Sequence, residues 1–127
     1  MEPLPEATAR FLKANIDSVE QLEVLRALAA DRNRVWDCRA LAGEVQARPQ
    51  AVARHLDALE RRGLITVARG PIPTYRYGAN TPELEDAVSR LLQLYNERPV
   101  TLIRLVYEHA GGGHKTLADA LLLRKER

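Results

Sequence analysis

The chain has 127 residues, 46% of them hydrophobic, and a formal net charge of only +2. This length and composition predict one domain with a core of its own, and the small net charge excludes a strongly basic protein. No apolar run approaches the roughly 18 residues that a membrane-spanning helix needs, and the first residues are polar. We therefore expect a cytoplasmic protein with no membrane partner.

Two helices are predicted in the first third of the chain. Residues 6–14 include the apolar side chain of Phe11 and predict a short arm that packs on this chain or on a partner. Ser18 followed by Gln21 is a capping-box pattern, which starts a second helix that ends near residues 31–33. The inward stripe of this helix consists of Leu22, Leu25, Leu28 and Ala29.

A helix, a tight turn and the start of another helix are predicted next. Asp37 is a good N-cap, and Trp36 and Leu41 are spaced to form a hydrophobic staple around it. Apolar residues recur at helical spacing at Cys38, Leu41, Ala42 and Val45. Proline suits the first position of a helix and not its interior, so Arg48 and Pro49 end one helix and open the next.

The second of these two helices is expected to bury one face and expose the other. The buried positions are Val52, Leu56 and Leu59. The helix is expected to end at Gly63, because glycine adopts the left-handed conformation there while Leu64 folds back on Leu59. The residues left facing outward are Gln50, Ala51, Arg54, Asp57, Ala58 and Arg61.

The period of the pattern then changes from that of a helix to that of a strand. Ile65 and Val67 alternate with Thr66 and Ala68, and two tyrosines alternate in the same way across residues 74–77. This alternation predicts a β-hairpin whose loop is residues 69–73. The two prolines in that loop make it stiff, so the hairpin is expected to project as a wing of fixed shape.

Further helices are predicted after the hairpin. One begins at Thr81 and Pro82, and another follows Pro99 with apolar residues around most of its circumference. A monomer of this size can hardly bury such a helix on all sides, so residues 81–127 are expected to form a homodimerisation element. The predicted dimerisation residues are Leu102, Ile103, Leu105, Val106, Tyr107, Leu121 and Leu122.

Residues 40–42 (ALA) and 50–65 (QAVARHLDALERRGLI) resemble the recognition core of the ArsR-like and MarR-like winged-helix regulators of bacteria. The resemblance implies that the second helix enters the major groove of DNA through Gln50, Ala51 and Arg54, and that the wing contacts DNA through Arg69. It also implies that terminal helices pair two subunits. The expected fold is mainly α with a small β-hairpin wing, a winged helix-turn-helix with extra N- and C-terminal helices. We expect a single domain over residues 1–127, with its winged-helix core at 16–78.

Positive charge is concentrated where these contacts are expected. Residues 37–77 contain seven Lys and Arg against four Asp and Glu, a net charge of +3, while residues 1–36 and 78–127 have net charges of −1 and 0. Gln50 is expected to read a base edge such as that of adenine, and Arg54 to read guanine or clamp a phosphate. The predicted residues that bind double-stranded DNA are Arg48, Gln50, Ala51, Arg54, Arg69 and Arg76, of which Arg48, Arg69 and Arg76 contact the backbone.

Patterns for catalysis, cofactors or metals are poor. Residues 111–116 lack the Gly-Lys-Thr order of a phosphate loop and are expected to form a flexible turn. His55, His109 and His114 lack the spacing of a local zinc pair. Cys38 lies on the inward face of its helix and is expected to be a core thiol. We expect no enzymatic activity, no cofactor and no metal.

Two functions remain open from the sequence. The first is a dimeric DNA-binding transcriptional regulator. The second is a winged-helix module that binds a protein partner without sequence-specific DNA recognition, because fold alone does not decide function. The local charge excess favours the regulator. The modest net charge and the apolar wing tip, Pro71-Ile72-Pro73, favour the interaction module.

Overall fold

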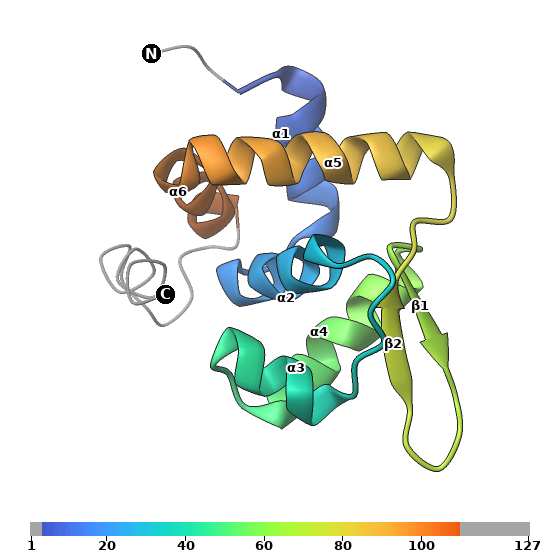
Figure 1. Cartoon of the computed structure of the whole chain (residues 1–127). Helices are drawn as coiled ribbons and strands as arrows, with labels where there is room; N and C mark the ends of the chain where they lie inside the picture. Colours follow the sequence, from blue (N-terminus) through green and yellow to red (C-terminus); the bar gives the residue numbers. More distant parts are fainter. Residues whose placement is uncertain (1–3, 110–127) are drawn as a thin grey trace. The chain divides into compact units, whose positions relative to one another are not determined.

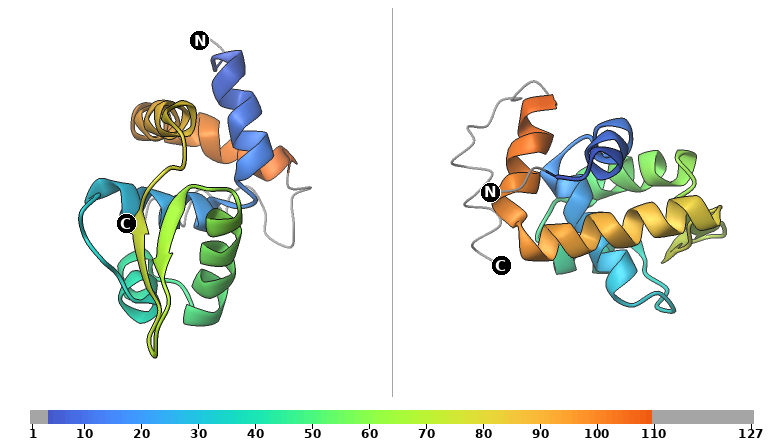
Figure 2. Two further views of the ribbon diagram at one scale, coloured as in Figure 1. Left: turned by 90° about the vertical axis from the view of Figure 1, so that its right-hand side faces the viewer. Right: turned by 90° about the horizontal axis from the view of Figure 1, so that it is seen from above.

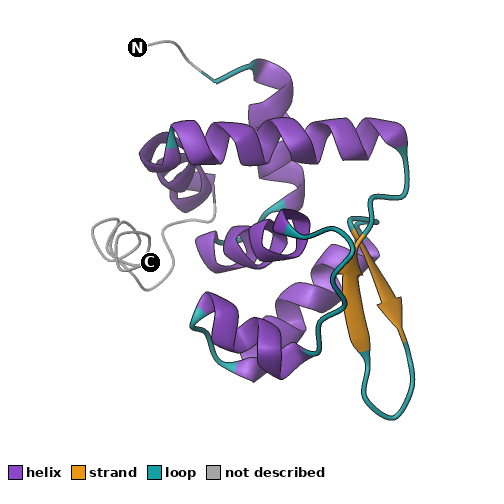
Figure 3. Ribbon diagram, in the orientation of Figure 1, coloured by secondary structure: helices purple, strands orange, loops and turns teal. Residues whose placement is uncertain are grey.

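The computed structural model describes residues 4–109, which form six helices and one antiparallel hairpin (Figures 1 and 3). The elements are α1 (Glu6–Asn15), α2 (Val19–Ala30), α3 (Cys38–Val45), α4 (Pro49–Arg61), β1 (Ile65–Ala68), β2 (Thr74–Tyr77), α5 (Pro82–Glu97) and α6 (Pro99–His109). The predicted class, mainly α with a small hairpin wing, is confirmed. The chain divides into a central unit, residues 20–86, and a terminal unit, residues 1–19 and 87–127. No helix within residues 4–109 has the length and apolarity needed to cross a bilayer.

The helix-turn-helix of the central unit forms as the local signals predict. The Asp37 carboxylate accepts a hydrogen bond of 2.7 Å from the Ala40 amide, which caps the start of α3. Trp36 and Leu41 on either side of this cap are both buried. Helix α3 ends at Val45, the left-handed backbone of the following Gln46 turns the chain, and Pro49 takes the first position of α4.

Helix α4 ends in the predicted left-handed glycine. Gly63 has a φ of +76°, and its amide donates to the Glu60 carbonyl while the Leu64 amide donates to the Leu59 carbonyl, both at 3.0 Å. These two bonds form a Schellman motif, which satisfies carbonyls that the helix end would otherwise leave unpaired. One prediction for this helix was wrong. Ala58, expected to face outward, is buried.

The wing is a two-stranded hairpin, and the segment that precedes α3 pairs with its strand β2. Ile65 of β1 pairs with Tyr77 of β2, and both side chains are buried. Trp36 pairs with Tyr75 through two backbone hydrogen bonds of 2.8 and 2.9 Å, so the segment before α3 joins the free edge of β2. This pairing ties the hairpin to the start of the helix-turn-helix. The loop of residues 69–73 extends beyond the paired strands (Figure 2).

A polar cluster fixes the base of the hairpin within the central unit. The Tyr77 hydroxyl donates to Glu85 at 2.7 Å, and Glu85 also pairs with Arg32. The Arg32 guanidinium lies 4.7 Å from the centroid of the Tyr77 ring. Burial, followed by the hydrogen bond to Glu85, raises the pKa of Tyr77 well above its usual value. The cluster joins residues just after α2, at the end of β2 and in the first turn of α5.

The terminal unit contains α1, α6 and the greater part of α5. The predicted arm is helix α1, which packs on α6 of the same chain and buries Leu12. Helix α5 begins at Pro82, as predicted. The Thr81 hydroxyl caps its first turn by accepting a hydrogen bond of 3.1 Å from the Leu84 amide. The buried apolar residues of α5 and α6 are Val88, Leu91, Tyr95, Leu102, Ile103 and Val106.

Two glycines provide a test of the helix-turn-helix geometry. A Cβ at Gly63 would lie 2.5 Å from the Asn80 side-chain nitrogen at a positive φ, whereas a Cβ at Gly43, inside α3, would meet nothing within 4 Å. We expect Gly63→Ala to lower the free energy of unfolding by about 1–2 kcal/mol. The matched variant Gly43→Ala is expected to raise it by up to about 1 kcal/mol. Urea denaturation measures both, and equal effects from the two variants would contradict the assigned left-handed turn.

Candidate nucleic-acid interface

Helix α4 presents one polar face to solvent. Its opposite face is in the core, where Val52, Leu56 and Leu59 have no exposed surface. Gln50 and Arg54 are exposed and, being four residues apart, lie above one another on the helix. The stripe continues through Asp57 and Arg61, which are also exposed, and Ala51 beside it is half-buried. The helix packs along β1, so this stripe and the wing belong to the same compact unit (Figure 2).

Exposed arginines lie on α3 and at the start of α4. Arg48 immediately precedes the helix, and its side chain makes no capping hydrogen bond. Arg39, near the start of α3, is also exposed. Among residues 4–109, neither Arg39, Arg48 nor Arg54 has an acidic partner. Arg39 was missing from the predicted site, although its position outside the apolar stripe of α3 was a signal that it would be exposed.

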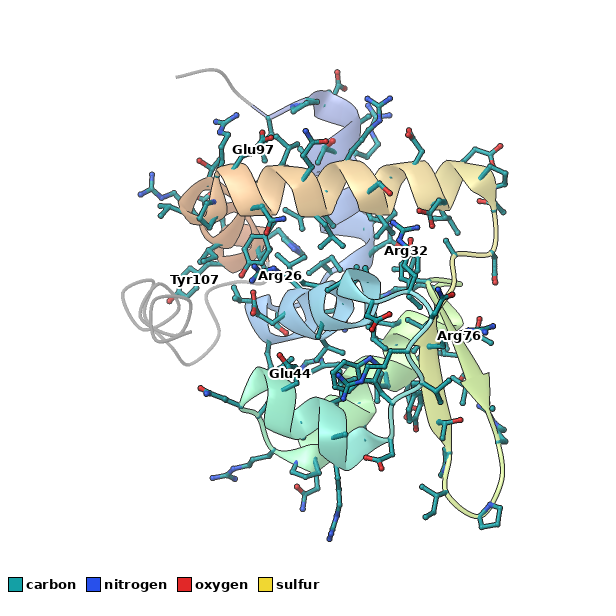
Figure 4. All side chains as sticks on the ribbon, viewed as in Figure 1. Arg26, Arg32, Glu44, Arg76, Glu97 and Tyr107 are labelled. Atoms are coloured by element: carbon teal, nitrogen blue, oxygen red, sulfur yellow. The ribbon has the colours of Figure 1, made fainter. Side chains whose placement is uncertain are left out.

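Arg76 lies on the wing. It is exposed on β2, opposite the exposed Thr66 of β1 in the hairpin register. Figure 4 shows its side chain extending away from the strands. The same figure shows Glu44 on α3, which is the exposed acid of that helix. Exposed arginines of the unit that have no acidic partner within residues 4–109 therefore include Arg39 on α3, Arg48, Arg54 and Arg61 along α4, and Arg76 on β2.

Arg69, at the base of the wing loop, is placed differently from the other arginines. Its guanidinium donates two hydrogen bonds of 2.9 Å to the two carboxylate oxygens of Glu60 near the end of α4. This pairing raises the pKa of Arg69 and lowers the pKa of Glu60, chiefly through the hydrogen bonds themselves. The charge of Asp57 also contributes to the raised pKa of Arg69. Glu60 near the end of α4 and Arg69 of the wing loop thus neutralise each other's charge.

Two residues considered as ligands or reactive groups have structural partners. His55 Nε2 lies 2.9 Å from Glu20 Oε1, which links α4 to α2 beneath the exposed stripe. The Cys38 thiol donates to the Pro49 carbonyl at 3.3 Å, across the turn between α3 and α4. Burial, followed by the nearby charge of Asp37, raises the pKa of this thiol, so it stays protonated at neutral pH.

Within residues 4–109, no group of three or more His, Cys, Asp or Glu is arranged to hold a metal ion. Ile72 at the wing tip is 72% exposed, so it does not pack against its own unit. Leu105 and Tyr107 of α6 are half-buried. The predicted turn at residues 111–116, His114, Leu121 and Leu122 lie outside the described residues.

Comparison with solved structures identifies proteins of the same architecture. Reduced HlyU from Vibrio cholerae N16961 has a TM-score of 0.53 at 17% identity, covering 72% of this chain and 90% of that one. A possible transcriptional regulator from Methanosarcina mazei Go1 has a TM-score of 0.53 at 13% identity, covering 76% and 83%. A MepR mutant from S. aureus, bound to an oligodeoxyribonucleotide, has a TM-score of 0.55 at 16% identity, covering 94% and 80%.

No protein-family model matches the chain, and a search of curated proteins finds no relative. The structural likeness instead extends over most of the chain in each comparison. In this chain the central unit has a leading helix, a helix-turn-helix and a hairpin in that order. The chain therefore has the winged helix-turn-helix fold, with additional helices at both ends.

Proposed function

We propose that the protein is a DNA-binding transcriptional regulator that reads the major groove with α4. The observation that carries this proposal is the exposed stripe of α4. Gln50 and Arg54 face solvent on the side of the helix opposite its fully buried apolar face, and neither Arg48 just before the helix nor Arg39 on α3 has an acidic partner within residues 4–109. A protruding helix with amide and guanidinium groups on its outer face matches the width and the hydrogen-bonding pattern of the major groove.

Each residue of the stripe has a distinct part in the proposed complex. Gln50 pairs with an adenine edge, accepting from N6 and donating to N7, and Arg54 donates to guanine O6 and N7. Ala51 contacts a thymine methyl group. Arg48 and Arg76 contact phosphates, which set the position of the helix in the groove without reading sequence.

The structural neighbours support this proposal. The MepR mutant was solved with an oligodeoxyribonucleotide, and the Methanosarcina mazei protein is described as a possible transcriptional regulator. A regulator of this kind works in the cytoplasm and needs no catalytic group. The regulatory function proposed here rests on the exposed chemistry of α4, because the shared fold by itself hosts several functions.

We also propose that the regulator is a homodimer that pairs through its terminal helices. Leu102, Ile103 and Val106 are already buried in the single chain, so they support α6 from within. Leu105 and Tyr107 of the same helix keep part of their surface exposed and are the contact residues among those described. A two-fold dimer presents two copies of α4, which read two half-sites about 34 Å apart or a multiple of that spacing.

The interaction-module alternative has one specific observation in its favour. Ile72 is 72% exposed at the tip of a stiff wing, between two exposed prolines. A lone apolar side chain gains little beside phosphates, whereas it gains about 1–2 kcal/mol when a protein pocket covers it. The regulator remains the preferred function, because α4 offers several groups with the chemistry for base edges and phosphates.

The first prediction for this function concerns Arg54. We expect Arg54→Ala to weaken binding to a selected DNA site by about 1–3 kcal/mol, because it removes a base-edge contact. Lys13→Ala, which removes one positive charge from α1, is the matched control and is expected to change affinity far less. Fluorescence anisotropy with a site selected from random sequence measures both. Equal affinities for wild type and Arg54→Ala would contradict the proposal that α4 reads the base sequence.

The second prediction concerns the dimer. Sedimentation at micromolar concentration is expected to give a mass of twice the 14.2 kDa of one chain. Leu105→Glu is expected to yield a folded monomer, because it places a charge in the proposed interface on a side chain that the single chain buries only in part. Circular dichroism checks that the variant is folded. A wild-type monomer at this concentration would contradict the dimer.

The third prediction separates the two functions at the wing tip. Because Ile72 is exposed, Ile72→Ser is expected to leave the melting temperature unchanged. The regulator predicts nearly unchanged DNA affinity for this variant as well. A loss of binding to a partner protein identified by cross-linking, with DNA affinity absent in both forms, would instead favour the interaction module.

A further inference from the structure

Arg69, at the base of the wing loop, forms an ion pair with Glu60 of α4. Its two terminal nitrogens each donate to one oxygen of Glu60, Nη1 to Oε2 and Nη2 to Oε1, both at 2.9 Å. This is the bidentate geometry with which an arginine also binds a phosphate. The Arg69 guanidinium therefore cannot present the same edge to DNA while Glu60 holds it.

The pair is exposed and can exchange its partners. The Arg69 side chain is 68% exposed and that of Glu60 is 32% exposed. Water and salt reach both groups, which weakens their attraction and lets another anion compete. Asp57 adds a second negative charge that acts on Arg69. Arg54 and Arg76, by contrast, have no such competitor among the residues described.

We propose that Glu60 competes with DNA phosphate for Arg69 and thereby lowers the affinity of the wing for DNA of any sequence. The inference rests on the proposed function, because it requires that the wing approaches DNA. Each phosphate neutralised by a protein cation releases counterions, which strengthens binding at low salt and steepens its salt dependence. By withholding one cation, Glu60 reduces both quantities. Discrimination then depends more on α4 and less on sequence-independent contacts of the wing.

The pair has properties that make this role testable without unfolding the protein. An ion pair between two solvent-exposed groups contributes little to stability, so its loss should leave the fold intact. Glu60→Gln keeps the size and a hydrogen-bond acceptor but removes the charge. Glu83→Gln removes the same charge from an exposed site in the first turn of α5, outside α3, α4 and the wing. It is therefore the matched control for any general effect of net charge.

The experiment measures binding of the full chain to a random-sequence DNA duplex by fluorescence anisotropy between 50 and 200 mM salt. For Glu60→Gln we expect the slope of log K against log salt to steepen by about 0.9, the value for one added phosphate contact. The gain in affinity over wild type is therefore expected to be roughly threefold larger at 50 mM salt than at 200 mM. Glu83→Gln is expected to change the slope little. Adding Arg69→Ala to Glu60→Gln is expected to abolish the gain, while melting temperatures stay similar.

The other outcomes overturn the inference in distinguishable ways. If Glu60→Gln behaves like Glu83→Gln, Glu60 does not compete for the wing arginine. If Glu60→Gln binds more weakly than wild type, Glu60 instead orients Arg69 for its contact. If wild type and all variants fail to bind DNA at 50 mM salt, the proposed function fails together with the inference. A gain that survives Arg69→Ala would assign the effect to another cation.

Discussion

The burial of one face of α4 is the interaction on which the candidate interface depends. Val52, Leu56 and Leu59 have no exposed surface. Each such side chain contributes about 1.5–3 kcal/mol relative to an exposed position. Because their spacing follows the helical repeat, they fix the rotation of the helix about its axis, and Gln50 and Arg54 must then face solvent. A rotation by one residue, about 100°, would bury polar groups and expose leucines.

The wing takes its position from the same helix through a very short connection. Gly63 reverses the chain in a left-handed conformation, and β1 begins two residues later. The hairpin base is then held by the hydrogen bond from Tyr77 to Glu85 and by the backbone pairing of Tyr75 with Trp36. These contacts fix the base of the hairpin while the loop beyond it remains exposed. The position of the wing cations is therefore a consequence of the rotation of α4.

The sequence predicted those features that neighbouring residues determine. Asp37 caps the helix that follows it and Gly63 terminates the helix before it, so both signals act through adjacent backbone groups and were readable. Ala58 was misplaced because a small side chain fits either face and only tertiary packing decided that it is buried. The pairing of Glu60 with Arg69 was also unpredictable, since it joins a helix to a loop across a turn whose geometry the residue pattern does not specify.

The modest net charge of the chain is compatible with DNA binding, because some of its exposed arginines are free of acidic partners among residues 4–109 while Arg69 is paired with an acid. Arg39, Arg48 and Arg54 are exposed without acidic partners among residues 4–109, whereas Arg69 is compensated by Glu60. Sequence-independent attraction depends on the number of cations that reach phosphates, and discrimination depends on the groups that reach base edges. Under the proposed function, an apolar wing tip and a compensated wing arginine would reduce the first contribution and leave the second intact. The distribution of charge in the central unit would then shift the balance of binding from the wing toward α4.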